Sequence, residues 1–230
     1  SGEVVFEPDQ VFKQYSNEGA MYLSDDIELT DEIKIHAGLR YSSFQHSGNI
    51  RFLDYIKNEF TRSNDNYRHV EGRISLRYLL NVNNSIKASY SQNYQYVHLA
   101  STSAVSLPTD LWIPSSLGIE PKFADQYALG YFKNLKDNLF ETSIELYYKE
   151  MTNLLEYKEG VLPEDNTNTS SDDAFTFGTG DSYGIELLIT KKSGGTTGWI
   201  GYTLSKTTRY FDEVNNGIEF PAKYDRRHDL

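Results

Sequence analysis

The sequence predicts an all-β fold: an antiparallel meander of about eight strands that forms part of a larger transmembrane β-barrel. Three observations predict it. Strand-length segments alternate apolar and polar residues, short turns alternate with long polar loops, and Tyr (18) and Phe (12) dominate the aromatic content. A barrel strand needs only about 9–11 residues with an apolar side chain at every second position. The modest 38% hydrophobic content is therefore compatible with a membrane wall.

The first two strands are expected at about residues 18–29 and 33–44, joined by a tight turn at Thr30-Asp31-Glu32. The second strand alternates without interruption, which is typical of a strand with two different faces. Its apolar positions are Ile33, Ile35, Ala37, Leu39 and Tyr41, and its polar positions are Lys34, His36, Gly38, Arg40 and Ser42.

The second hairpin is expected at about residues 69–80 and 85–99. The residues between its strands, Asn81-Val82-Asn83-Asn84, predict a turn because asparagine tolerates a positive φ angle. Polar loops of about 45–68 and 100–124 precede and follow this hairpin.

Two further hairpins repeat the pattern. Strands at about 125–135 and 139–151 meet at Lys136-Asp137-Asn138, and strands at about 181–192 and 197–206 meet at Ser193-Gly194-Gly195. Loops of about 152–180 and 207–223 follow them. Short turns at one end and long loops at the other are typical of outer-membrane barrels, whose long loops are external. We therefore expect the four loops on the external side.

The alternation also predicts which side chains share a face, because a one-residue slip would exchange the faces of a whole strand. One face is expected to carry Ile35, Leu39, Leu76, Ile86, Ile144 and Leu187. The opposite face is expected to carry Lys34, Arg40, Arg73, Lys87, Glu145 and Glu186. Gly38, Gly130, Gly184 and Gly201 fall inside strands, where they relieve curvature or face a domain inside the barrel.

Several short strings occur in a fixed order along the chain. They are Tyr22–Thr30 with Ala37–Tyr41, Ala88–Gln92, Ala124–Tyr131, Ser182–Glu186, Trp199–Thr207 and Phe220–His228. Together they resemble the barrel of TonB-dependent outer-membrane receptors. The resemblance implies residence in the outer-membrane lipid and import of a small-molecule, glycan or peptide ligand. It also implies an inner-membrane TonB-type energy-transducing complex as partner, reached through a plug domain. Residues 1–230 are then expected to be a partial barrel domain, without the plug and the closing strands.

Composition argues against several other classes. A net charge of −11 without a basic stripe argues against nucleic-acid binding. The absence of cysteine excludes disulfides and thiolate metal sites. No catalytic fingerprint occurs, so neither an enzyme nor a cofactor is expected. The five histidines are scattered, and the acidic pairs Glu164-Asp165 and Asp172-Asp173 are best interpreted as a solvated loop, so no metal site is expected.

Two rival functions and one candidate site remain. The rivals are a self-contained eight-stranded barrel, acting as an adhesin or a lipid-modifying enzyme, and a soluble all-β glycan-binding module. The candidate ligand-binding residue is Trp112, in the string Leu111-Trp112-Ile113-Pro114 of the second predicted loop. Tryptophan offers a large rigid surface that often contributes binding energy. The alternative is that Trp112 packs the loop or lies at the lipid boundary.

Overall fold

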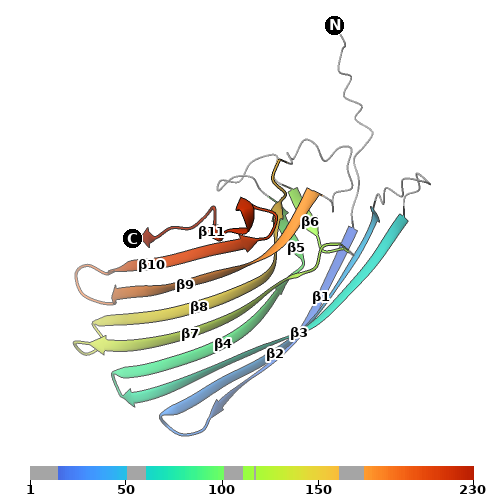
Figure 1. Cartoon of the computed structure of the whole chain (residues 1–230). Coiled ribbons are helices and arrows are strands. Elements are labelled where there is room, and N and C mark those ends of the chain that lie inside the picture. Colours follow the sequence, from blue (N-terminus) through green and yellow to red (C-terminus); the bar gives the residue numbers. More distant parts are fainter. Residues whose placement is uncertain (1–14, 51–60, 101–110, 117, 161–173) are drawn as a thin grey trace.

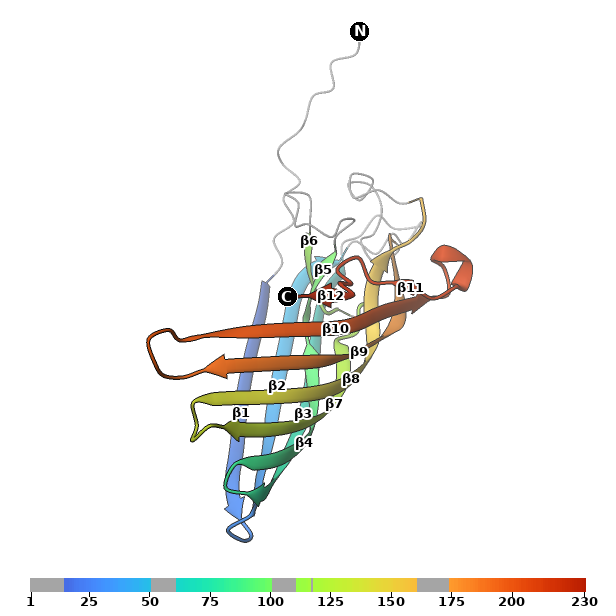
Figure 2. The same cartoon turned by 90° about the vertical axis from the view of Figure 1, so that its left-hand side faces the viewer.

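A computed structural model describes residues 15–50, 61–100, 111–116, 118–160 and 174–230. They form an antiparallel sheet that bends into a curved wall (Figure 1), and Figure 2 shows the same wall from the side. Its eight long strands follow one another as a meander. They are β1 (Tyr15–Glu28), β2 (Ile33–Ile50), β3 (Thr61–Asn81), β4 (Asn84–Gln95), β7 (Lys122–Leu135), β8 (Phe140–Tyr157), β9 (Phe175–Lys191) and β10 (Gly198–Phe211).

The predicted eight-strand meander is confirmed, but the predicted strand ends on the loop side are wrong. β2 and β3 extend through residues 45–50 and 61–68, and β8 and β9 reach residues 157 and 175, all of which were expected to be loop. Backbone pairing continues after the apolar alternation stops, because ladder hydrogen bonds do not require apolar side chains. The prediction followed the side-chain pattern and therefore ended these strands too early.

The predicted division into two faces is also confirmed by the strand register. One row of paired residues crosses the whole sheet on the apolar face: Ile27, Ile35, Leu76, Ala88, Leu129, Leu146, Ile185 and Leu204. The neighbouring row on the opposite face is Lys34, Arg77, Lys87, Gly130, Glu145, Glu186 and Thr203. We call these the outer face and the inner face.

The turn between β3 and β4 uses asparagine in a different way from the one predicted. Neither Val82 nor Asn83 has a positive φ angle. Instead, the Asn81 side-chain oxygen accepts hydrogen bonds from the Asn83 backbone N–H (3.0 Å) and the Asn84 side-chain amide (2.7 Å). Such a side-chain turn holds the chain reversal without a left-handed backbone. Positive φ angles occur in the next turn, at Lys136, Asp137 and Asn138.

The four strand glycines singled out in the sequence all lie at inner-face register positions. At Gly130, a Cβ atom would lie 2.8 Å from the Phe132 ring and 3.1 Å from Glu145 Cγ. At Gly184, it would lie 2.7 Å from the Leu204 carbonyl oxygen. Gly130 therefore makes room for a side chain of its own strand and one of the next strand, and Gly184 makes room for the backbone of β10.

The predicted fourth strand, about 85–99, ends early, at Gln95, and its last residues pair with part of the second predicted loop in a small two-stranded sheet. This sheet pairs β5 (Val97–Ala100) with β6 (Leu111–Pro114), so that Leu99 lies opposite Trp112. β4 and β7 are shorter than their neighbours on the loop side, and this hairpin lies beyond their ends, between β3 and the β8–β9 pair (Figure 1). The Tyr67 hydroxyl of β3 donates a hydrogen bond to the Ser116 carbonyl oxygen at 2.5 Å. On the other side, Ile113 packs against a buried cluster of Ala100, Ile119, Leu155, Tyr157, Ala174 and Phe175.

The segment after β10 folds back along the free edge of that strand. It contains a 3-10 turn, η3 (Asn215–Gly217), and the short strands β11 (Phe220–Pro221) and β12 (His228–Asp229), both antiparallel to β10. Within the described residues β1 and β10 do not pair, so the sheet is an open wall and not a closed eight-stranded barrel. No helix in the described part of the chain is long and apolar enough to span a membrane.

Candidate functional site

The outer face exposes a continuous band of large apolar side chains. On β1, for example, Met21 and Leu23 are 75% and 77% exposed, and the band continues through Leu39, Ile74, Leu129, Leu146 and Ile185 to Leu204. A soluble protein rarely exposes an apolar surface of this extent. The band covers the turn-side part of the strands, which identifies that part as membrane-spanning. The inner face, which carries the charged rows, then lines the interior of the barrel.

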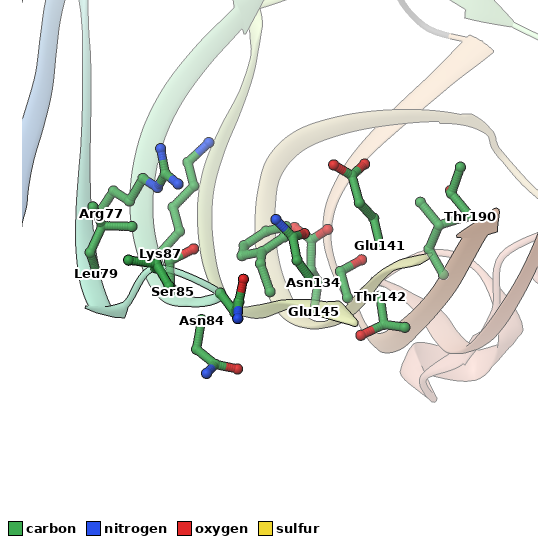
Figure 3. Close-up of a pocket in the computed structure, with 15 residues that line it drawn as sticks. Arg77, Leu79, Asn84, Ser85, Lys87, Asn134, Glu141, Thr142, Glu145 and Thr190 are labelled. Carbon is green, nitrogen blue, oxygen red and sulfur yellow. The ribbon is translucent and has the colours of Figure 1, made fainter. Parts of the chain in front are cut away.

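A groove of about 460 Å³ crosses the turn-side end of the inner face (Figure 3). Arg77 and Lys87 line one side of it, and Glu141 and Glu145 line the other. Arg77 lies directly opposite Lys87 in the register, and Glu145 lies directly opposite Glu186. The groove therefore has a basic side and an acidic side. Each side holds a pair of like charges, and such pairs destabilise a sheet when nothing neutralises them.

Further toward the loops, a hydrogen-bonded network joins β2, β3 and the end of β4. The Ser42 hydroxyl donates to Glu71 Oε1 at 3.0 Å and lies 2.6 Å from the Tyr96 hydroxyl. His69 Nδ1 lies 3.0 Å from the same Tyr96 hydroxyl. Ser42, Glu71 and Tyr96 are buried, and the Tyr96 ring stacks on Phe44 with 5.0 Å between ring centroids. With their polar atoms paired, these residues stabilise the wall and do not form an open site.

A second inner-face cluster gathers charged residues from β7, β8, β10 and the C-terminal segment. Glu156 is 8% exposed, and its Oε2 lies 3.0 Å from Arg209 Nη1 while its Oε1 lies 2.5 Å from Lys223 Nζ. The guanidinium carbon of Arg209 lies 5.3 Å from the centroid of the Tyr224 ring. Lys122 is near enough to both Arg209 and Glu156 to interact electrostatically. We call Lys122, Glu156, Arg209 and Lys223 the basic cluster.

A buried apolar cluster lies next to the basic cluster on the inner face. Ala124, Met151, Leu154 and Phe211 form a buried cluster on the same face, with Val214 and Phe220 packed against it. Phe211 is fully buried because β9 has glycine at position 178, where a Cβ atom would lie 2.5 Å from the Phe211 ring. Close packing of this kind fixes the end of β10, and therefore Arg209, relative to β8.

The candidate Trp112 makes none of the contacts that define the basic cluster. Its side chain is 67% exposed on the β5–β6 hairpin, while the next residue, Ile113, packs against the apolar cluster on the other side. The structure therefore does not bury Trp112 in the packing that holds the hairpin. Its role in ligand binding stays a prediction.

The histidines take structural positions. The buried His98 lies 3.0 Å from the Ser115 hydroxyl through Nε2, and burial, followed by the charge of Lys122, lowers its pKa to about 4. His36 pairs with Asp26 at 2.8 Å. Among the residues that the structure describes, no three His, Cys, Asp or Glu side chains are grouped as metal ligands. Glu164-Asp165 and Asp172-Asp173 lie outside the described residues.

Sequence reasoning did not predict the basic cluster. Its four members span about half of the chain, so no local motif contains them. The one local signal is the string Phe220-Pro221-Ala222-Lys223-Tyr224, which contributes to the family resemblance. Lys223 and Tyr224 from this string both contact the charged residues of the cluster.

The lipid-facing band and the charged inner face define this chain as a piece of wall from an outer-membrane β-barrel. Residues 3–226 match the family model described as TonB dependent receptor-like, beta-barrel, and the chain belongs to this family. It is accordingly part of an outer-membrane protein of Gram-negative bacteria. No curated protein sequence matches it.

Solved structures of outer-membrane receptors share the fold. The ferripyoverdine receptor of Pseudomonas aeruginosa is 17% identical, with a TM-score of 0.63, and the match covers 94% of this chain and 25% of that one. The ferric-catecholate import receptor Fiu of Escherichia coli K12 is 13% identical, with a TM-score of 0.59 and coverages of 94% and 31%. The alcaligin receptor of Bordetella pertussis is 16% identical, with a TM-score of 0.58 and coverages of 94% and 33%. The chain thus spans about a quarter to a third of these receptors.

Proposed function

We propose that this chain forms part of the barrel of a receptor that imports a ligand across the outer membrane, driven by an inner-membrane TonB-type complex. The observation that carries the proposal is the contrast between the two faces of the wall. The outer face meets lipid, while the inner face presents charged rows that only a water-filled or protein-filled interior accommodates. In this role, the plug occupies the interior and transmits the energy of the inner-membrane complex.

The open sheet supports this role over that of a small closed barrel. β1 and β10 are separated by the width of the whole sheet, and an unpaired strand edge cannot persist in lipid. More strands of the same receptor, which continue the sheet on both sides, satisfy these edges. The exposed apolar band disfavours a soluble glycan-binding module. In a soluble protein this band would be in contact with water over the full width of the sheet, which is unfavourable.

The proposal is tested in cells that carry the full-length receptor. The receptor gene is deleted and then restored, and growth is scored on a panel of single iron and carbon sources, with the inner-membrane complex intact or disabled. We expect deletion to abolish growth on at least one source, and disabling the complex to have the same effect while the receptor stays in the outer membrane. Growth that persists when the complex is disabled would exclude energy-coupled import.

A further inference from the structure

The basic cluster has more positive than negative charge within the described residues. Lys122, Arg209 and Lys223 contribute three cations, whereas Glu156 contributes one carboxylate. Both Glu156 oxygens are engaged, one by Arg209 and the other by Lys223. Within the described residues, no hydrogen bond or ion pair engages the Lys122 side-chain ammonium, although Glu156 attracts it electrostatically. A half-buried lysine next to a second cation is costly unless an anion accompanies it.

The guanidinium of Arg209 leaves a hydrogen-bonding position unused. Its Nη1 binds Glu156, and its Nη2 donates to the Tyr224 hydroxyl at 3.4 Å. Its Nε is buried and has no hydrogen-bond partner among the residues that the structure describes. Buried donors in native proteins are nearly always satisfied, so an unsatisfied N–H beside an unpaired lysine indicates a group that is bound in the working protein.

The position of the cluster suits a binding role. It lies on the inner face beyond the membrane-spanning band, at the loop-side ends of β7, β8 and β10. The Lys223 side chain is 32% exposed, so the cluster is open to the interior of the barrel. Burial, followed by the positive charge of Arg209, lowers the pKa of Lys122 to about 8. This direction is the one expected for an ammonium group that lacks a counter-ion.

We propose that Lys122, Arg209 and Lys223 form a subsite for an oxyanion, a carboxylate or phosphate group, carried by the imported ligand. The arginine offers N–H donors in a planar arrangement that matches such groups, and the lysines add charge. Glu156 holds Arg209 and Lys223 in place and limits the net charge of the empty subsite. This inference rests on the proposed import function, because it assigns the chemistry of what the interior receives.

The test measures binding of citrate and inorganic phosphate to the purified full-length receptor in detergent, by calorimetry at low and at high salt. The uncharged sugar maltotriose serves as the comparison probe. We expect citrate to bind saturably, more weakly at high salt, and maltotriose not to compete with it. Lys122→Gln should weaken citrate binding by about tenfold or more, as expected for the loss of a charge-assisted hydrogen bond. Lys122→Arg should restore most of it.

Two further variants separate charge from structural damage. Glu156→Gln removes the negative charge with little change in shape, and citrate should then bind more tightly than to the unmodified receptor. A merely structural role of Glu156 predicts no such gain. Lys34→Gln changes an inner-face lysine at the turn end, where it pairs with Glu28, and should leave citrate binding unchanged.

Failure of this inference differs from failure of the import function. If citrate and phosphate do not bind, or bind equally to the receptor and to Lys122→Gln, the subsite is excluded even when receptor-dependent growth is intact. The subsite is likewise excluded if an acidic side chain of the plug already fills the cluster and prevents binding of added anions. Loss of energy dependence in the growth assay would instead overturn the import function.

Discussion

Glu156 Oε2 and Arg209 Nη1 lie 3.0 Å apart although a whole strand, β9, runs between β8 and β10, which carry them. Their side chains meet above β9, where Arg209 lies opposite Gly180 and Glu156 lies opposite Thr176. A Cβ atom at Gly180 would be 2.7 Å from the Thr208 carbonyl oxygen and 2.8 Å from Leu154 Cδ1. Glycine in β9 thus allows the groups from the two flanking strands to meet.

The glycines of β9 should be sensitive even to alanine. At Gly178, a Cβ atom would lie 2.1 Å from the Tyr210 carbonyl oxygen, and backbone atoms cannot yield as a flexible side chain does. We expect Gly178→Ala to destabilise the full-length receptor by about 1–3 kcal/mol through overpacking. The measurement is the thermal unfolding temperature in detergent. Gly198→Ala in β10, where no atom lies within 4 Å of the added Cβ, is the matched control and should unfold like the unmodified receptor.

Acid should loosen the β5–β6 hairpin. Burial lowers the pKa of His98 in the folded state to about 4, against an ordinary value of 6.5. The unfolded hairpin therefore binds more protons between these values, and stability falls as the pH drops from 6.5 to 4, by up to about 3 kcal/mol. Above pH 6.5 both states are neutral and stability does not change through this group. Limited proteolysis of the receptor between pH 4 and 7 should show increased cleavage near the hairpin. In His98→Gln, cleavage should lose most of its pH dependence.

The assignment of faces predicts opposite outcomes for two adjacent residues of β8. Leu146 lies on the outer face and Glu145 on the inner face, opposite Glu186. Leu146→Arg should destabilise the barrel by about 2–4 kcal/mol, because an arginine near the bilayer midplane is costly. Glu145→Arg should be tolerated, since it replaces a like-charge pair with an opposite-charge pair. Refolding into lipid vesicles, followed in urea, distinguishes the two. Equal sensitivity at both positions would contradict the assignment.

Substitutions at Trp112 and Ile113 should affect different properties: ligand affinity at Trp112, and folding of the hairpin at Ile113. If the exposed Trp112 contacts ligand, Trp112→Ala should lower affinity by about tenfold or more with normal surface expression. Ile113→Ala should reduce expression or protease resistance instead, because it removes packing from the buried cluster. Affinity and surface expression are measured separately on the full-length receptor, with the ligand found by the growth panel. Unchanged affinity in Trp112→Ala removes this residue from the binding site.

The 230-residue chain by itself should not form a closed barrel. Its sheet leaves β1 without a partner on one side within the described residues, and lipid cannot satisfy the exposed backbone groups. We expect the isolated chain to aggregate or associate when refolded in detergent. A monomer that migrates differently on a gel before and after heating would be evidence for closure and would contradict this prediction.

The strands of the wall can be predicted well from the sequence, because the pattern that defines each strand lies within a few consecutive residues. A strand such as Ile33–Ser42 shows its two faces in ten consecutive residues, and pairing with its neighbours then follows from short turns. The loop-side region depends on contacts between distant residues. In the sequence, Glu156 and Lys223 look like any other charged residues, because only the folded backbone brings them into contact. The periodicity of the sequence does not indicate that contact. For the same reason, the pairing of Tyr67 with Ser116 and the early loop boundaries could not be derived from alternation alone.

The charge-separated groove at the turn end also generates an electric field directed along the wall, from β3 and β4 toward β8. Lys87 on β4 and Glu145 on β8 are separated by one strand, β7, and hence by about 10 Å. This separation is comparable to the Debye length at physiological salt, so counter-ions do not erase the field within the groove. A dipolar molecule or peptide segment lying there has its lowest energy with its negative end toward β3 and β4. Along this groove the field therefore favours one orientation of a zwitterion over the other, without a contact to any single side chain.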